Sequence, residues 1–298
     1  MSKSVVGMIG LGIMGSAMSE NLMKDGFTVL GFDVLEDSVQ AHVDRGGEAR
    51  ISVREVAEAA EIIITSLPSP AALNDVIQGE DGLLSATDAS PIIIETSTLE
   101  IADKQRGHDA LKEAGIELLD CPLSGTGAQA RTKDLVVLAS GDKPSYERAI
   151  PVFEGFSRSN YHVGEFGNGS KMKFVANLLV AIHNASAAEA LVLGMKAGLN
   201  PDDIFKVISD GAGSSRMFEI RGPMMVAADY DDATMKNAVW QKDMRVIGDF
   251  AKALDCPTPL FSSTEPLYKA AMDQGRDNQD TAAICAVLED MAGLPERK

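Results

Sequence analysis

The sequence is poor in cysteine, histidine and aromatic residues, and each shortage excludes a class of protein. Its 298 residues include 3 cysteines, 4 histidines and 1 tryptophan, and aromatic residues make up 5% of the chain. Distant cysteines without a CxxC pair indicate neither a disulfide framework nor a structural zinc site, and they fit a reducing cytoplasm. The histidines form no HExxH pair and no carboxylate cluster has metal-loop spacing, so we expect no metal.

Positive charge is also scarce. The chain has 27 lysines and arginines against 44 aspartates and glutamates, which gives a formal net charge of −17. Such a field repels nucleic acid, and no basic run or basic and aromatic patch offsets it, so we expect no nucleic-acid partner. An anionic ligand must therefore be held by a local cluster of donors.

Long apolar runs are missing as well. No uninterrupted run reaches the roughly 18 residues of a membrane span. The N-terminal MSKSVVGMIG enters a strand-like run directly, without the charged and apolar regions of a signal peptide. We therefore expect a cytoplasmic protein with no membrane segment, whose 45% hydrophobic content is that of an ordinary globular chain.

The first half of the chain alternates short apolar runs with helical segments. Continuous runs such as Ile62–Ile64 and Ile92–Ile94 are typical of parallel strands that are buried on both faces. The runs are VVGMI, FTVLGFD, EIIITSLP, PIIIETS, IELLDCPL and DLVVLAS. This pattern predicts an α/β, Rossmann-type doubly wound parallel sheet domain over residues 1–163.

The second half, residues 164–298, is helical almost throughout. Gly198 ends one helix, Pro201 lies in the first turn of the next, and CPTP at 256–259 stops another. We predict an all-α domain that serves substrate binding and dimerisation. A long interdomain helix over residues 170–197 joins it to the first domain.

A glycine-rich loop follows the first predicted strand. Its six residues form GxGxxG and are Gly10, Leu11, Gly12, Ile13, Met14 and Gly15. The loop opens a helix whose free N–H groups can bind a pyrophosphate, and a second strand then ends in Asp33, placed to bind a ribose hydroxyl. A ligand-free glycine turn is the alternative, but strand, helix, strand and acid together favour a dinucleotide.

The residue type at position 33 bears on the choice of cofactor. A carboxylate repels the 2′-phosphate of NADP, and the following segment VLEDSVQAHVD has no basic residue before Arg45. We therefore expect NAD, while NADP stays open because other loops can supply a cation.

The segment GNGSKMKFVAN at 167–177 begins an apolar helix with two lysines. Residues four apart share a helix face, so Lys173 and Asn177 lie together, whereas Lys171 points elsewhere. Lys173 can be a snorkelling residue or a buried functional one. A phosphate loop is excluded, because GEFGNGSK has its serine before its lysine.

Four segments, in order and spacing, resemble the signatures of the β-hydroxyacid dehydrogenases. They are GLGIMGSAMSENLMKDG from residue 10, DCPLSGTGAQA at 120–130, GNGSKMKFVAN at 167–177 and KDM at 242–244, with GRDNQDTAA at 275–283 as a fifth. This family includes 3-hydroxyisobutyrate, tartronate semialdehyde and threonate dehydrogenases and is related to 6-phosphogluconate dehydrogenase. The resemblance covers nearly the whole chain.

The resemblance implies roles for individual residues. Lys173 would be the catalytic general acid and base and Asn177 would orient the substrate. Ser124, Gly125 and Thr126 would bind the substrate, although the family usually has glycine where Thr126 stands. The cofactor side would include Leu67, Pro68, Ser97, Thr98 and Lys242.

The segment GAGSSRMFEIRGP at 211–223 resembles the threonate dehydrogenases within that family. Arg216 and Arg221 would then bind a second polar end of the substrate. Equally, both arginines can pair with nearby carboxylates such as Glu219.

The family resemblance implies a hydride transfer between NAD(P) and a small anionic β-hydroxy acid such as 3-hydroxyisobutyrate, glycerate or threonate. A buried lysine that is neutral near neutral pH can take the hydroxyl proton. A reductase of succinic semialdehyde, glyoxylate or tartronate semialdehyde is the enzymatic alternative. A catalytically silent dinucleotide-binding module is disfavoured because Lys173, Asn177 and Ser124 occur together. We also expect a homodimer or homotetramer.

Overall fold

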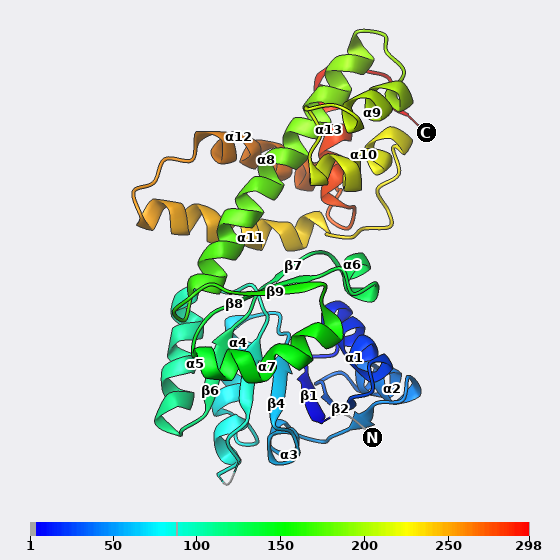
Figure 1. The fold of residues 1–298 in the computed structure, drawn as a ribbon. Helices are drawn as coiled ribbons and strands as arrows, with labels where there is room; N and C mark the ends of the chain where they lie inside the picture. Colours follow the sequence, from blue (N-terminus) through cyan, green and yellow to red (C-terminus); the bar gives the residue numbers. More distant parts are fainter. Residues whose placement is uncertain (1–3, 88, 298) are drawn as a thin grey trace. The chain divides into compact units, whose positions relative to one another are not determined.

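The computed structural model describes residues 4–87 and 89–297. The chain divides into two compact units, Met1–Lys173 and Phe174–Lys298. The boundary falls inside the long helix α8 (Asn168–Lys196), so that this helix begins in one unit and continues into the other (Figure 1).

The first unit contains a parallel sheet with the strand order β3-β2-β1-β4-β5-β6. The strands are β1 (Val5–Ile9), β2 (Thr28–Phe32), β3 (Glu48–Ala49), β4 (Ile62–Thr65), β5 (Ile92–Glu95) and β6 (Glu117–Asp120). The order reverses between β1 and β4, and ligands of such sheets bind at the carboxyl ends of the strands beside this reversal. The prediction of a Rossmann-type doubly wound domain is confirmed.

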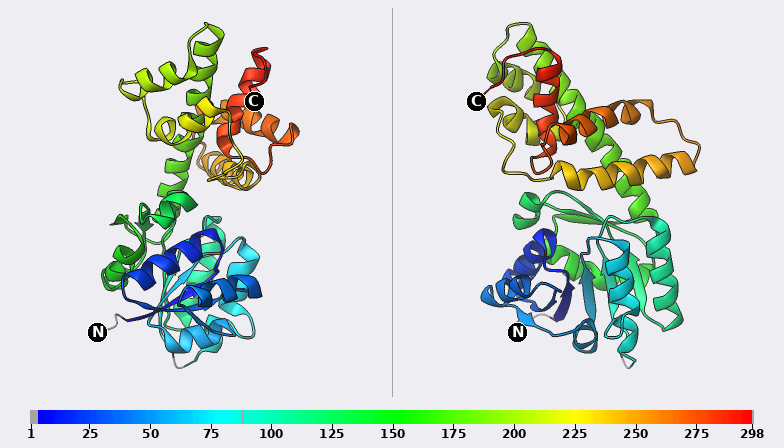
Figure 2. Two further views of the ribbon diagram at one scale, coloured as in Figure 1. Left: turned by 90° about the vertical axis from the view of Figure 1, so that its right-hand side faces the viewer. Right: turned by 180° about the vertical axis from the view of Figure 1, so that it is seen from behind.

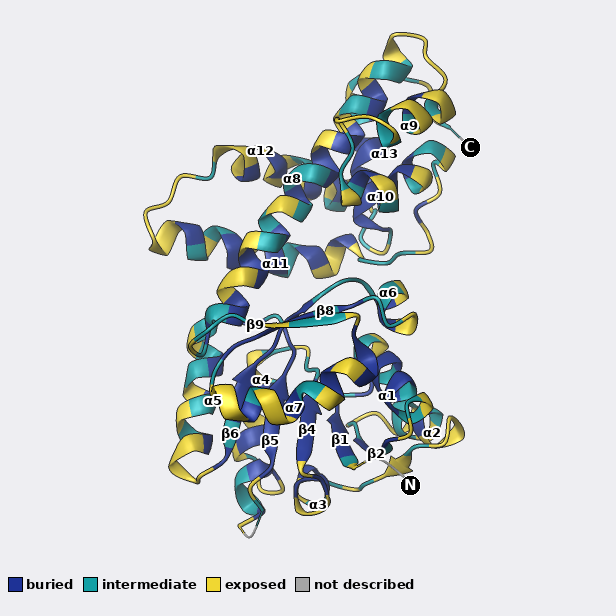
Figure 3. Cartoon of the chain, in the orientation of Figure 1, coloured by how far each residue is buried: buried dark blue, intermediate teal, exposed yellow. Residues whose placement is uncertain are grey.

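Both faces of this sheet are buried, as the continuous apolar runs predict. Ile62 and Ile64 point into one core with residues of α1 (Ile13–Lys24) and α7 (Lys143–Phe156). Ile63 points into the opposite core. That core also holds residues of α3 (Val53–Ala59), α4 (Pro70–Gln78) and α5 (Ile101–Glu113), so helices cover both sides of the strands (Figures 2 and 3).

A smaller sheet accounts for one run that we assigned to the parallel sheet. Its strands are β7 (Leu123–Ser124), β8 (Val136–Ala139) and β9 (Ser159–His162), with β7 antiparallel to β8. The run DLVVLAS forms β8 of this sheet. The sequence alone does not distinguish the two sheets, because a run of buried apolar residues suits a strand of either one. A bridge between Asp120 and Ser140 links the end of β6 to the end of β8.

The second unit is helical, as predicted, and α9 begins at Pro201 as the sequence indicates. Its elements are the remainder of α8, α9 (Pro201–Ser209), α10 (Arg216–Ala227), α11 (Asn237–Ala253), α12 (Pro259–Asp273), a 3-10 turn at Thr281–Ala283 and α13 (Ile284–Met291). CPTP does more than stop a helix, because Pro259 is the first residue of α12, where its missing N–H costs nothing.

Helix α8 is apolar enough to cross a membrane by length and composition alone. One 18-residue window has a mean hydropathy of 1.5, a property that core helices of soluble proteins share. Asn184 in its middle donates to the Tyr268 hydroxyl over 3.1 Å and to the Thr281 carbonyl over 2.9 Å. These contacts are those of a helix packed on protein. They describe α8 more directly than the absence of an uninterrupted apolar run in the sequence does.

Candidate active site

Two glycines of the loop after β1 are required by the chain itself. Gly10 has φ +91°, and a side chain there would run into the Ser66 carbonyl. A side chain at Gly15 would run into the Gly10 carbonyl. These two positions therefore let the turn close and α1 pack against it.

Gly12 is different, because among the described residues nothing beyond its own chain neighbours lies within 4 Å of the place where its Cβ would be. It caps the N-terminus of α1 without any side-chain hydrogen bond. The first N–H groups of a helix have no partner within the helix and carry a partial positive charge. Open space in front of such donors fits the pyrophosphate of a dinucleotide, which a side chain at this position would crowd.

Asp33 lies directly beside this loop. Its Oδ2 accepts from the Leu11 N–H over 2.6 Å, and its Oδ1 accepts from the Leu35 N–H over 2.9 Å. These bonds fix the carboxylate at the end of β2, and each oxygen keeps a lone pair for a ribose hydroxyl.

A groove of about 390 Å³ runs along the first two turns of α1. Its charged lining residues are the basic Arg45 and Arg131 and the acidic Glu20 and Asp37. Arg45 was noted in the sequence, but Arg131 was missed because it lies far along the chain, in α6 (Gly127–Arg131).

Two loops at the carboxyl edge of the sheet are fastened to each other. The Leu67 N–H, after β4, donates to the Ser97 Oγ, after β5, over 2.8 Å. Ser97 is buried, Leu67 and Thr98 are half-buried, and Pro68 is exposed. The structure thus brings together the residues that were expected on the cofactor side of the first unit.

The segment after β7 packs against α1. A side chain at Gly127 would run into Ile13, and the buried Asn21 side chain donates to the Ala130 carbonyl over 2.6 Å. The Ser124–Thr126 loop therefore lies in the same unit as the glycine loop, held by the helix that the glycine loop begins.

One donor of that loop is already engaged. The Thr126 N–H donates to Gln129 Oε1 over 3.0 Å, so a substrate carboxylate at this N–H would have to displace the glutamine. Gln129 was not singled out from the sequence, although the Thr-x-x-Gln pattern is that of a capping box, in which the glutamine bonds back to the threonine N–H. Gly125 has φ +139°, a value that only glycine adopts without strain.

The two lysines at the start of α8 differ as the helix phase predicts. Lys173 is 8% exposed. Lys171 is exposed, and its Nζ donates to Asn168 Oδ1 over 3.1 Å. The two lysines thus face different environments, and of the two alternatives for Lys173 the structure shows the buried one.

Asn177, one turn after Lys173, has a buried partner that was missed in the sequence. Its Nδ2 donates to Asp243 Oδ2 over 3.0 Å, and both side chains are buried. Lys242, half-buried, lies 4.0 Å from Asp243 Oδ1. The sequence does offer a signal for this partner. A carboxylate within the apolar face of α11 needs hydrogen-bond donors from a neighbouring element.

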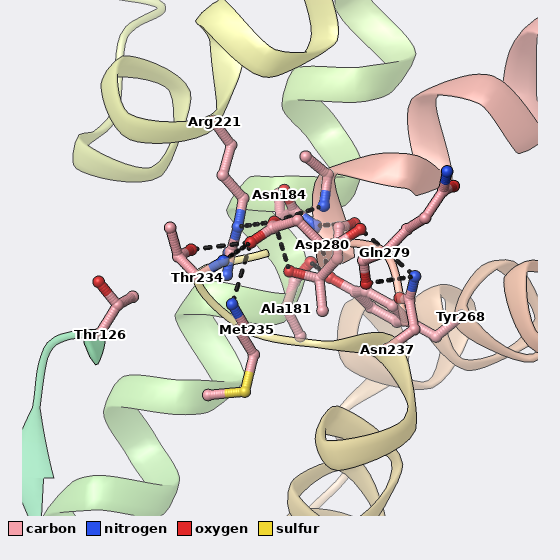
Figure 4. A network of polar contacts seen from close by, with 12 residues as sticks. Thr126, Ala181, Asn184, Arg221, Thr234, Met235, Asn237, Tyr268, Gln279 and Asp280 are labelled. Atoms are coloured by element: carbon pink, nitrogen blue, oxygen red, sulfur yellow. Dashed lines mark hydrogen bonds and ion pairs between the residues drawn. The ribbon is translucent and has the colours of Figure 1, made fainter. Parts of the chain in front are cut away.

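The two arginines of the second unit have carboxylate partners. Arg216 is 69% exposed and lies 3.2 Å from Glu219 Oε2. Arg221 is 2% exposed, and its Nε donates to Asp280 Oδ1 over 3.0 Å (Figure 4). Pairing with nearby carboxylates is therefore observed for both, although the partner of Arg221 is Asp280 and not Glu219.

Asp280, from the segment GRDNQDTAA, organises the surrounding loops. Its Oδ2 accepts from the N–H and the hydroxyl of Thr234, each over 2.8 Å, and from the Met235 N–H over 3.0 Å (Figure 4). Burial alone would raise the pKa of Asp280, but Arg221 and these donors outweigh it and hold the pKa below its usual value. Asp280 is thus a buried carboxylate anion with a structural role.

Both parts of the chain match known families. Residues 5–164 match the NAD-binding domain of 6-phosphogluconate dehydrogenase. Residues 167–288 match the family described as NAD-binding of NADP-dependent 3-hydroxyisobutyrate dehydrogenase. The two matches account for most of the chain and follow the order of the resemblance seen in the sequence.

Similar proteins extend over the whole chain. The 2-(hydroxymethyl)glutarate dehydrogenase of Eubacterium barkeri is 32% identical over 99% of this chain and 98% of its own. The L-threonate dehydrogenase of Cupriavidus necator is 30% identical over 95% of both. Among solved structures, a 3-hydroxyisobutyrate dehydrogenase from Salmonella typhimurium has a TM-score of 0.85 at 29% identity, covering 96% of this chain and 100% of that one.

These matches agree with a glycine loop that fits a dinucleotide and with a buried lysine at the start of α8. The chain belongs to the β-hydroxyacid dehydrogenase family and is an NAD(P)-dependent oxidoreductase.

Proposed function

We propose that the protein interconverts a small anionic β-hydroxy acid and the corresponding carbonyl acid, with Lys173 as general acid and base. The observation that carries this proposal is the burial of Lys173 in the GxGxxxKxxxN segment, two residues after the exposed Lys171. Bound NAD(P) supplies the hydride acceptor or donor. The chain supplies the group that moves the proton.

Lys173 Nζ takes the hydroxyl proton when the substrate is oxidised and returns it to the carbonyl oxygen in reduction. Asn177 follows one turn later on the same helix. Because an ionised carboxylate only accepts hydrogen bonds, Asp243 holds the Nδ2 end of Asn177 toward itself. The Oδ1 end then points the other way and can accept from the lysine or the substrate hydroxyl.

The substrate carboxylate would bind at Ser124 and Gly125. The Thr126 N–H serves only if Gln129 moves, since it already donates to Gln129 Oε1. The L-threonate and 2-(hydroxymethyl)glutarate dehydrogenases are relatives of similar length, and both named substrates are hydroxy acids. Glycerate, 3-hydroxyisobutyrate and threonate are therefore the substrates that we place first, and the exposed Arg216 would serve the longer ones.

A second function, reduction of small aldehyde acids, is favoured by one observation. A protein of Arabidopsis thaliana named glyoxylate/succinic semialdehyde reductase 2 is 32% identical over 95% of this chain. The same residues would serve both directions, with the Lys173 ammonium donating to the carbonyl. Comparing the reduction of glyoxylate, succinic semialdehyde and tartronate semialdehyde with the oxidations establishes the preferred direction.

We propose NAD as the preferred cofactor, because the Asp33 carboxylate is fixed beside the glycine loop. Arg45 and Arg131 in the adjacent groove are the residues that would otherwise attract a 2′-phosphate. For location we propose the cytoplasm, where the three free cysteines stay reduced.

We also propose a homodimer or homotetramer. Val175 and Leu179, four residues apart on α8, are exposed apolar side chains that share a face. Light scattering of the purified protein gives the number of copies, and a monomer at micromolar concentration would contradict this assignment.

The deciding experiment measures NADH formation with threonate, erythronate, glycerate, 3-hydroxyisobutyrate, 4-hydroxybutyrate and tartrate for the wild type and for Lys173→Ala. Loss of a positioned acid and base should lower kcat on the order of 100- to 10,000-fold while NAD binding persists. Lys171→Ala, two residues away and exposed, is the matched control and should keep kcat. Substantial turnover by Lys173→Ala, or NAD binding with no turnover of any substrate by the wild type, would overturn the proposal.

A further inference from the structure

Two buried carboxylates lie side by side at the carboxyl edge of the parallel sheet. Glu95 and Asp120 are the last residues of β5 and β6, and they are register partners on these adjacent strands. Both are 0% exposed. Two ionised carboxylates on adjacent, paired strand positions repel each other strongly inside a protein, so the pair requires a cation or a shared proton.

Lys104 of α5 supplies the cation. Its Nζ lies 2.6 Å from Glu95 Oε2 and 2.8 Å from Asp120 Oδ1, and the side chain is 0% exposed. Burial alone would lower the pKa of Lys104, but the two carboxylates outweigh it and raise the pKa above its usual range. The adjacent Cys121 adds no charge, because burial raises the pKa of its thiol well above the ordinary value.

One branch of this cluster leads to the start of α8. Asp120 Oδ2 accepts from the Ser170 N–H over 2.7 Å, and Asp120 Oδ1 accepts from the Ser170 hydroxyl over 2.8 Å. The preceding Gly169 N–H donates to the Ser140 hydroxyl over 2.9 Å. A strand carboxylate thus holds the first turn of the helix, and Lys173 follows three residues after Ser170.

The other branch leads to the loops after β4 and β5. Glu95 Oε1 accepts from the Ser97 N–H over 2.9 Å. Ser97 Oγ in turn accepts from the Leu67 N–H over 2.8 Å. An unbroken series of hydrogen bonds and ion pairs therefore runs from the Leu67 loop through Lys104 to the first turn of α8.

We propose that Lys104 is a positioning residue, which bridges Glu95 and Asp120 and thereby fixes Lys173 relative to the loops that hold the cofactor. The inference rests on the proposed role of Lys173. A well-packed apolar group often stabilises as much as a buried ion pair, so what the three charges add is a defined geometry. A displacement of about 1 Å between reacting groups can cost on the order of 100-fold in rate.

The test compares Lys104→Met with the double variant Lys104→Met/Glu95→Gln. The single variant leaves two unpaired carboxylates and should lose both thermal stability and kcat. The double variant removes one carboxylate with the cation, so it should recover most of the Tm. Its kcat should nevertheless remain on the order of 10- to 100-fold below that of the wild type, because the bridge is absent. For the same reason its KM for NAD should be higher than that of the wild type.

Two further variants separate positioning from general damage. Ser170→Ala removes only the hydroxyl on the α8 branch, so it should lower kcat severalfold with an unchanged KM for NAD. Lys112→Met makes the same substitution at an exposed site on α5 and should match the wild type. This variant is the control for the helix.

Recovery of wild-type kcat and KM by the double variant, or an unchanged kcat in Ser170→Ala, would overturn the inference. Activity remaining in Lys173→Ala would instead refute the role of Lys173 itself. The failure of the Lys104 inference and the failure of the Lys173 proposal are therefore distinguishable. The Lys104 variants test the positioning only if Lys173→Ala has itself lost turnover.

Discussion

Asn177 Nδ2 donates a hydrogen bond to Asp243 Oδ2 over 3.0 Å, between α8 and α11 of the second unit. Both side chains are buried, so neither partner can exchange this bond for water without a structural change. The carboxylate decides which end of the amide faces it, and thereby which end remains for the substrate. The function of Asn177 thus depends on a residue from another helix.

Neutralising Asp243 should reduce turnover more than cofactor binding. In Asp243→Asn the new side chain both donates and accepts, so it no longer dictates the orientation of Asn177. We expect kcat to fall about tenfold or more, with the KM for NAD unchanged. Asp249→Asn, on the exposed side of α11, is the matched control. Equal kcat values for the two variants would show that the Asn177 orientation does not depend on Asp243.

Cofactor choice should respond to the charge of Asp33. Asp33→Asn keeps one oxygen for the Leu11 N–H, which donates to Asp33 Oδ2 in the wild type. It removes the negative charge and also the second oxygen, which accepts from the Leu35 N–H. The ratio of kcat/KM for NAD to that for NADP should fall about tenfold, since repulsion of the 2′-phosphate disappears. Asp44→Asn, exposed at the end of α2 (Glu36–Asp44), should leave the ratio unchanged. An unaltered ratio in Asp33→Asn would remove Asp33 from the specificity argument.

The sequence predicts features that depend on local periodicity. The triple-isoleucine runs of β4 and β5 indicate burial on both faces, and the structure confirms it. Helix phase alone separates Lys173 from Lys171, because the angle between residues on a helix does not depend on the rest of the fold.

Features that depend on pairing between distant segments are not predictable in this way. The run that forms β8 has the same composition as a parallel strand, and only its neighbours place it in the second sheet. Lys104 lies in IADKQRGHDALKE, where a lysine is expected to be solvated, and its burial follows from two strands that both end in an acid. Reading the acidic ends of β5 and β6 together would have indicated the need for a cation.

Breaking the buried ion pair of Arg221 should destabilise the second unit. Arg221→Met leaves the buried Asp280 carboxylate without its cation, which typically costs about 3–5 kcal/mol in the free energy of unfolding. In Arg221→Met/Asp280→Asn the unpaired charge is removed, so part of this loss should return. Urea unfolding of the three proteins measures the difference. Additive losses in the double variant would mean that the two side chains act independently.

The stability of the first unit should fall in mild acid because of His42. This ring is 2% exposed, it lies against Gly31 and Gly47, and its Nε2 is 3.2 Å from the Val29 carbonyl. Burial lowers the pKa of His42, against the weaker opposing effect of the Val29 hydrogen bond. In the unfolded chain the pKa is about 6.5, so the unfolded state binds the proton first.

The sign follows from that order of the two pKa values. The contribution of neutral His42 is complete above about pH 6.5 and is lost as the pH falls toward the pKa of the folded state. His42→Leu cannot be protonated at this position. Relative to His42→Leu, the wild type should therefore have a smaller free energy of unfolding at pH 5.5 than at pH 7.5. If urea titrations give the same difference at both pH values, the folded protein accommodates the charged ring, and His42 is not a source of acid sensitivity.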